Sequence, residues 1–139
     1  MNSESIKLMQ LRMERAEETL ADAKKLLSDG SLRSAVNRFY YAILYAARAI
    51  LALKRLDSAK HSGVISLFNK EFVKTGELPK EYGRIIGNVF NRRIEGDYSD
   101  IKTFSHEEVN DIAEDCEKFV SVIMEYLKQY IEKGGARDE

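Results

Sequence analysis

Residues 32–55 read LRSAVNRFYYAILYAARAILALKR, and this stretch decides the fold. Apolar residues recur in it at the three- and four-residue steps of an α-helix, and small or aromatic residues occupy most of the remaining positions. The main stripe comprises Val36, Phe39, Tyr40, Ile43, Leu44, Ala47, Ile50 and Leu51. A helix that is apolar nearly all round must be surrounded by other elements, so this segment predicts a central helix.

The flanking sequence predicts four more helices by the same periodicity. The first covers residues 5–28 and the third covers residues 62–74, and a glycine follows each of them. Glycine accepts the left-handed conformation that closes a helix. The fourth helix begins at Pro79, a residue suited to a first helical turn, and its pattern breaks around Gly96.

Residues 96–104, GDYSDIKTF, are polar and lack helical periodicity, so they predict a loop. Ser105 and Glu108 then match a capping box, which opens a fifth helix that reaches about Lys133. Residues 134–139 are expected to form a frayed tail. The chain is therefore expected to be all-α, an up-and-down bundle of about five helices that forms a single domain over residues 1–139.

Composition and charge exclude several classes of protein. The 22 Lys+Arg residues balance 23 Asp+Glu, so no global basic field attracts duplex nucleic acid, and any such contact must be local. No apolar run reaches the ~20 residues of a membrane span, which favours a cytoplasmic protein without membrane contact. Cys116 has no partner in the chain and is expected to be a small buried hydrophobe.

The sequence lacks the common motifs for metals and cofactors. His61 and His106 do not stand in Glu-x-x-His, and the chain has no Cys-x-x-Cys pair, glycine-rich phosphate loop or Gly-x-Ser-x-Gly elbow. A divalent ion could be imagined at Asp97, Asp100, His106, Glu107 and Glu108. The last two, however, are explained by the dipole of the helix they begin. We therefore expect no metal and no cofactor.

Two groups of polar residues are harder to explain as ordinary surface. Arg38 and Arg48 interrupt the central helix, so each should pair with a carboxylate, reach solvent or hold an anion. The second group, the candidate ligand-binding residues together with Arg38, lies around the end of the fourth helix: Asn91, Arg92, Arg93, Asp97 and Tyr98.

This second group has two interpretations. Arg92 and Arg93 could grip a phosphate while Tyr98 stacks on a base or sugar. Equally, Arg93 could form a helix-terminal salt bridge to Asp97, with Tyr98 packed on the bundle.

Three motifs resemble the HEPN family of prokaryotic helical domains: A-x-x-R-x-Y-Y-A from residue 35, KHSGV from residue 60 and R-x-x-G-D-Y from residue 93. The resemblance implies a helical bundle that commonly dimerises. It also implies a gene beside a small nucleotidyltransferase, the two forming a toxin–antitoxin pair. Active members of the family are metal-independent ribonucleases that use an Arg-x4-6-His motif, with the pairs of two subunits facing each other.

This chain departs from that motif, because Asp97 and Tyr98 stand where a histidine is expected after Arg93 or Arg92. The candidate catalytic residues are then Arg93, Asp97 and Tyr98, but a carboxylate near its ordinary pKa is a poor proton donor. His61 or His106 could substitute. The simpler interpretation has His61 or Ser62 capping the third helix, and His106 exposed at the start of the fifth.

Three functions therefore remain open. The favoured one is a homodimeric accessory or regulatory HEPN protein that binds a nucleotide or RNA and partners a nucleotidyltransferase. The second is an enzyme, a metal-independent endoribonuclease with an altered site. The third is a helical oligomerisation module without a ligand. The homodimer is expected because the chain is too small to wrap its central helix completely.

Overall fold

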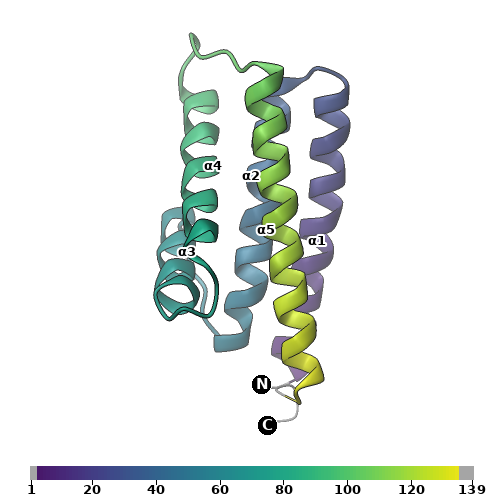
Figure 1. The fold of residues 1–139 in the computed structure, drawn as a ribbon, viewed down its shortest axis with the longest axis vertical. Coiled ribbons are helices and arrows are strands. Elements are labelled where there is room, and N and C mark those ends of the chain that lie inside the picture. The colour runs from purple at the N-terminus through teal and green to yellow at the C-terminus, as the bar shows by residue number, and fades with distance from the viewer. Residues whose placement is uncertain (1–2, 135–139) are drawn as a thin grey trace.

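The computed structural model describes residues 3–134, which form five α-helices and no strand. The helices are α1 (Ser3–Ser28), α2 (Leu32–Leu51), α3 (His61–Phe68), α4 (Lys80–Tyr98) and α5 (His106–Glu132). Figure 1 shows α2 between α1 and α4, with α5 beside it, and α1 begins where α5 ends. The predicted all-α bundle is confirmed. The expected frayed tail lies, from residue 135 onward, outside the described residues.

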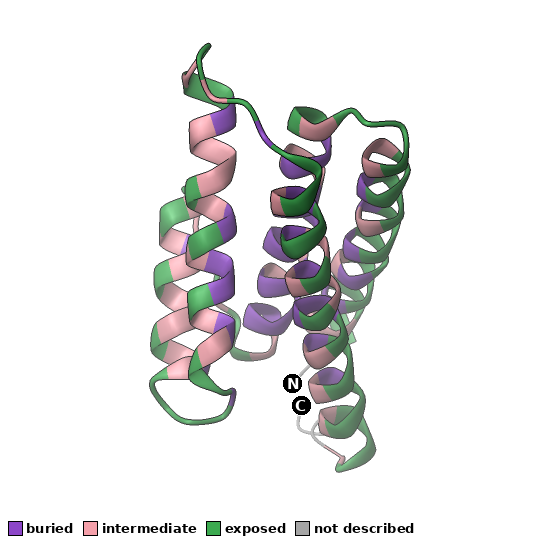
Figure 2. Ribbon diagram, turned by 45° about the horizontal axis from the view of Figure 1, so that its top comes forward, coloured by how far each residue is buried: buried purple, intermediate pink, exposed green. Residues whose placement is uncertain are grey.

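Helix α2 is the centre of the bundle, as its sequence predicts. It packs against α1, α5, α4 and α3. Most of its side chains are buried, and Figure 2 shows that buried residues line the inner faces of the helices. The main apolar stripe of α2 is thus covered within one chain, whereas Tyr41 and Tyr45 remain half-buried, and the expected second copy stays a prediction.

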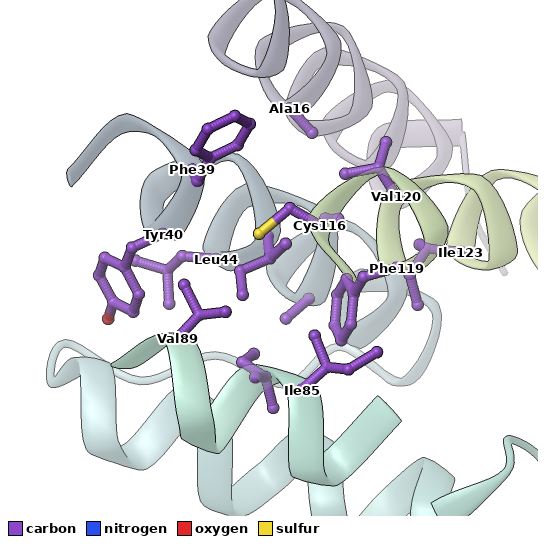
Figure 3. Close-up of a cluster of buried hydrophobic side chains, with 14 of the residues drawn as sticks. Ala16, Phe39, Tyr40, Leu44, Ile85, Val89, Cys116, Phe119, Val120 and Ile123 are labelled. Carbon is purple, nitrogen blue, oxygen red and sulfur yellow. The ribbon is translucent and has the colours of Figure 1, made fainter. Parts of the chain in front are cut away.

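The core lies where α2 meets α4 and α5. Figure 3 shows Leu44 of α2, Val89 of α4 and Phe119 of α5 converging, with the sulfur of Cys116 among them. Cys116 is fully buried, which confirms its predicted role as a small hydrophobe. Tyr40 lies at the edge of this cluster, and its hydroxyl is directed away from the apolar side chains.

The predicted end of the central helix at Arg55 is wrong by one turn. Helix α2 ends at Leu51 and tightens into a 3₁₀ turn over Ala52–Lys54. Arg55 then takes a left-handed conformation, φ 57°, and the N–H of Leu56 donates to the carbonyl of Leu51. These hydrogen bonds close the helix although apolar residues continue beyond it.

The third helix also differs from its prediction. It begins at His61 and widens after Phe68 into a π-helical turn over Asn69–Val73. Lys60 is its N-cap residue and makes no side-chain capping bond, so the prediction that His61 or Ser62 caps this helix is wrong. The His61 side chain is therefore free for other contacts.

The predicted loop over residues 96–104 is wrong at its start, because α4 continues to Tyr98. Gly96 does not end the helix. A Cβ atom there would lie 3.0 Å from the Phe104 ring, so glycine lets that ring pack against α4. The capping box of Ser105 and Glu108 at the start of α5 is confirmed.

Two kinds of feature are absent from residues 3–134. None of the helices in that range has the length and apolarity that crossing a bilayer requires. Within the same range, no three His, Cys, Asp or Glu side chains gather as a metal site would need.

Candidate functional site

Arg93 of α4 lies at the centre of a cluster with two tyrosines of α2. Its guanidinium carbon is 5.2 Å from the ring centroid of Tyr40 and 5.7 Å from that of Tyr41. One of its terminal nitrogens donates to the Tyr41 hydroxyl at 3.4 Å. These contacts hold the guanidinium against α2, and the Arg93 side chain is only 17% exposed.

Asp97 balances the charge of Arg93 one helical turn further along α4. Its Oδ2 lies 2.9 Å from Nε of Arg93, which is the helix-terminal ion pair that the sequence offered as one interpretation. The Nε–H group of Arg93 has no hydrogen-bond acceptor among residues 3–134. The pair is therefore ionic, and Arg93 keeps unused capacity to donate hydrogen bonds.

Arg38 of α2 reaches the same cluster from the other side. Its guanidinium carbon lies 4.9 Å from the Tyr41 ring centroid, and its nitrogens donate to the side-chain oxygen of Asn37. No carboxylate within the described part of the chain forms an ion pair with Arg38, unlike Arg48 and Arg93. A guanidinium stacked on a tyrosine without an acidic partner is well suited to hold an anion.

An open hollow of about 480 Å³ lies beside Arg38. Its lining residues are Leu26, Arg33, Ser34, Asn37, Arg38 and Asp97. Arg33 also donates to the carbonyls of Ser99 and Lys102, which ties the connection between α4 and α5 to α2. The hollow therefore has fixed walls on α2 and α4, and two of its lining residues are arginines.

His61 is the residue of this cluster that sequence reasoning left as a minor alternative. Its ring centroid lies 5.7 Å from that of Tyr40 and 5.6 Å from that of Tyr41, so it shares both tyrosines with Arg93. Burial lowers the pKa of His61 below its ordinary value, and the charges of Arg93 and Arg48 lower it further. The imidazole is neutral at neutral pH and can accept a proton.

Arg48 holds the loop before α3, and this loop leads directly into His61. The Arg48 guanidinium donates to the Ser58 carbonyl at 3.2 Å, and its Nε lies 3.8 Å from Asp57. Asp57 also accepts the Ser58 N–H and pairs with Arg12 of α1 at 2.8 Å. Arg48 therefore has a carboxylate partner, one of the three outcomes that the sequence required.

Tyr40 contributes a buried polar group to the cluster. Its hydroxyl is inaccessible to solvent and has no hydrogen-bond partner among residues 3–134. Burial raises the pKa of this hydroxyl, while the charge of Arg93 opposes the rise. The neutral phenol is therefore an unused hydrogen-bond donor beside the Arg93 guanidinium.

The remaining candidates lie apart from the cluster. Arg92 pairs with Glu95 on its own helix at 2.8 Å, and Asn91 is exposed. Tyr98 is 79% exposed, so it neither stacks beside Arg93 nor packs on the bundle. His106 is exposed at the start of α5, as expected. Of the predicted group, the structure brings together Arg93, Asp97 and Arg38.

The fold and the site together define a class of protein: a small helical bundle in which arginines, tyrosines and a histidine from α2, α3 and α4 form one cluster. The sequence profile of the HEPN domain matches residues 9–128. The chain is 42% identical over 126 residues to a "UPF0332 protein" of Thermotoga maritima, which covers 91% of this chain and 96% of that protein. The chain belongs to the HEPN domain family.

A second relative comes from Methanocaldococcus jannaschii and is named "Putative toxin MJ0605". It is 41% identical over 123 residues, which span 88% of this chain and 91% of that protein. Another protein of the same organism, named "Putative toxin MJ0142", is 32% identical over 130 residues and covers 88% of each chain.

Proposed function

We propose that this chain is a toxin-like HEPN protein that binds a phosphate of a nucleotide or RNA at the cluster of Arg38, Tyr41 and Arg93. The observation that carries this proposal is the Arg38 guanidinium, which stacks on Tyr41 beside the hollow and has no carboxylate partner among residues 3–134. Tyrosine stacking fixes the plane of a guanidinium and leaves its N–H groups available for phosphate oxygens.

The partner proposal is a two-component system with a nucleotidyltransferase. It is supported by family membership and by two relatives with the word toxin in their names. In that system the chain forms a homodimer. A nucleotidyltransferase encoded by the adjacent gene controls this homodimer. Co-purification of the chain with the product of the adjacent gene tests this part, and an adjacent gene of another class contradicts it.

Calorimetry with uridine monophosphate and with a short RNA tests the binding proposal. Arg38→Gln removes the unpaired charge and is expected to weaken binding by about tenfold. Arg84→Gln is the matched control, because Arg84 lines a separate hollow with Glu81 and Asp115. If the wild type binds neither probe, or if both variants weaken binding equally, the proposal is wrong.

A second candidate, a metal-independent ribonuclease, is favoured by the packing of His61 and Arg93 against the same two tyrosine rings. The neutral imidazole would take the proton of a 2′-hydroxyl, whose oxygen attacks the phosphorus while Arg93 stabilises the developing charge. The bond to the 5′-oxygen breaks, that oxygen takes a proton from water, and a cyclic phosphate remains.

Incubation of RNA with the protein and a chelator tests this candidate. His61→Gln should reduce cleavage by about a hundredfold or more. His106→Gln removes a histidine that is exposed at the start of α5, and it should leave the rate unchanged. If the wild type does not cleave RNA, the ribonuclease candidate is wrong. If cleavage persists in His61→Gln, His61 is not the base of the reaction. In both cases the binding proposal is unaffected.

A further inference from the structure

The accessible positions of α2 between Asn37 and Leu51 fall on one line. Arg38, Tyr41, Tyr45 and Arg48 are half-buried there, whereas most of the residues between them are fully buried. Their spacing of three, four and three residues places them on one helix face, which extends for about 15 Å along the axis. The central helix therefore has a solvent-accessible stripe with arginines at its ends and tyrosines between them. We call these four residues the α2 stripe.

Helix α1 adds a further cation to this stripe. The guanidinium carbon of Arg15 lies 5.2 Å from the ring centroid of Tyr45, as Arg38 lies 4.9 Å from that of Tyr41. The two tyrosine rings are 6.3 Å apart. Two guanidinium–tyrosine pairs thus stand side by side, and Figure 1 shows α1 alongside α2.

Arg15 and Arg38 differ from Arg48 and Arg93 in having no acidic partner among residues 3–134. Arg48 and Arg93 have Asp57 and Asp97 as partners, but neither Arg15 nor Arg38 forms an ion pair within the described part of the chain. The whole chain carries a formal net charge of -1, so the positive charge along the stripe is a local feature. Unpaired cations in a row favour a ligand with several regularly spaced negative charges.

We infer that the α2 stripe binds single-stranded RNA over several nucleotides, from Arg38 past Tyr41 and Tyr45 to Arg15. This inference rests on the proposed function, since the phosphate at Arg38 begins the track. A mononucleotide would leave Arg15 and Tyr45 unused. Single strands are bound where cations follow the backbone and tyrosine or guanidinium planes receive the unpaired bases, whereas the bases of a duplex are stacked inside it.

The test compares uridine monophosphate with oligouridylates of increasing length. Affinity should rise from the monophosphate to the short oligomers and then level off. Arg15→Gln should weaken hexauridylate binding by about threefold to tenfold and reduce the slope of log affinity against log salt by about 0.7, the value for one phosphate contact of a single strand. The same variant should leave binding of the monophosphate unchanged.

Two further variants sharpen the comparison. Tyr45→Leu keeps an apolar side chain on α2 but removes the stacking plane, and it should weaken hexauridylate binding by about tenfold. Arg84→Gln removes one charge beside Glu81 and Asp115 and should change neither the affinity nor the salt slope. Circular dichroism checks that each variant keeps its helical content.

The possible failures are distinguishable. If the monophosphate binds through Arg38 but neither chain length nor Arg15→Gln changes affinity, the site holds one phosphate, so the inference is wrong and the proposed function stands. If neither probe binds, both are wrong. If RNA does not bind and Arg15→Gln instead weakens self-association in sedimentation, the stripe is a protein interface and the inference is overturned.

Discussion

At the scale of single residues, Arg93 shows what the sequence can and cannot reveal. Its pairing with Asp97 is predictable, because residues four apart lie on one face of a helix. Its contacts with Tyr40, Tyr41 and, through them, His61 join three helices. No spacing in the sequence encodes such contacts, so periodicity alone could not choose between His61 and His106.

The coupling of His61 to Arg93 gives a pH prediction. Burial lowers the pKa of His61 and the positive charge of Arg93 lowers it further, so Arg93→Gln should raise that pKa, as NMR titration of the imidazole can measure. In the wild type the folded pKa lies below the unfolded value of about 6.5, so the unfolded chain binds the proton more readily. The contribution of His61 to stability is complete above the unfolded pKa and is lost as pH falls towards the folded pKa.

The control for this titration is Arg84→Gln, since Arg84 lines a hollow elsewhere on the bundle. It should leave the pKa of His61 as it is in the wild type. A pKa that stays constant or falls in Arg93→Gln would mean that burial alone determines the protonation of His61.

At the scale of elements, helix periodicity predicted all five helices, and errors arose where tertiary contacts decide an end. Gly96 is an example. A glycine after an apolar pattern usually ends a helix, but here it continues α4 because the Phe104 ring needs the space. The capping box of Ser105 and Glu108 was predictable because its hydrogen bonds are local.

The close approach of Gly63 to the loop before α3 gives the second prediction. A Cβ atom at Gly63 would lie 2.1 Å from the Ser58 hydroxyl oxygen and 2.8 Å from its Cβ. Gly63→Ala should therefore displace the loop that Arg48 holds and lower the free energy of unfolding by about 1–3 kcal/mol. Urea denaturation measures the loss.

Removal of the Ser58 side chain should relieve this clash. The double variant Ser58→Gly with Gly63→Ala should recover part of the stability that the single alanine loses, which a double-mutant cycle quantifies. If the two losses simply add, the contact between these residues is not the reason for glycine at position 63.

At the scale of the whole molecule, the fold accounts for the apolar excess of the central helix. Four helices pack against α2, and beyond Asn37 the accessible part of this helix is the α2 stripe of arginines and tyrosines. The sequence predicted that other elements surround α2, but it could not show whether those elements belong to the same chain. The homodimer therefore rests on family membership and stays a proposal.

The single thiol of Cys116 reports on whether this bundle opens as one unit. The residue is 0% exposed between α2, α4 and α5, and burial, followed by the charges of Asp115 and Glu117, raises its pKa. Since only an exposed thiolate reacts, labelling of the native protein with a disulfide reagent should be at least about a thousandfold slower than labelling of the urea-unfolded chain.

The labelling rate should rise with urea with the same slope as global unfolding, because α5 cannot expose Cys116 without breaking the core. Cys116→Ala provides the blank, and rapid native labelling independent of urea would show instead that α5 separates locally from an otherwise intact bundle.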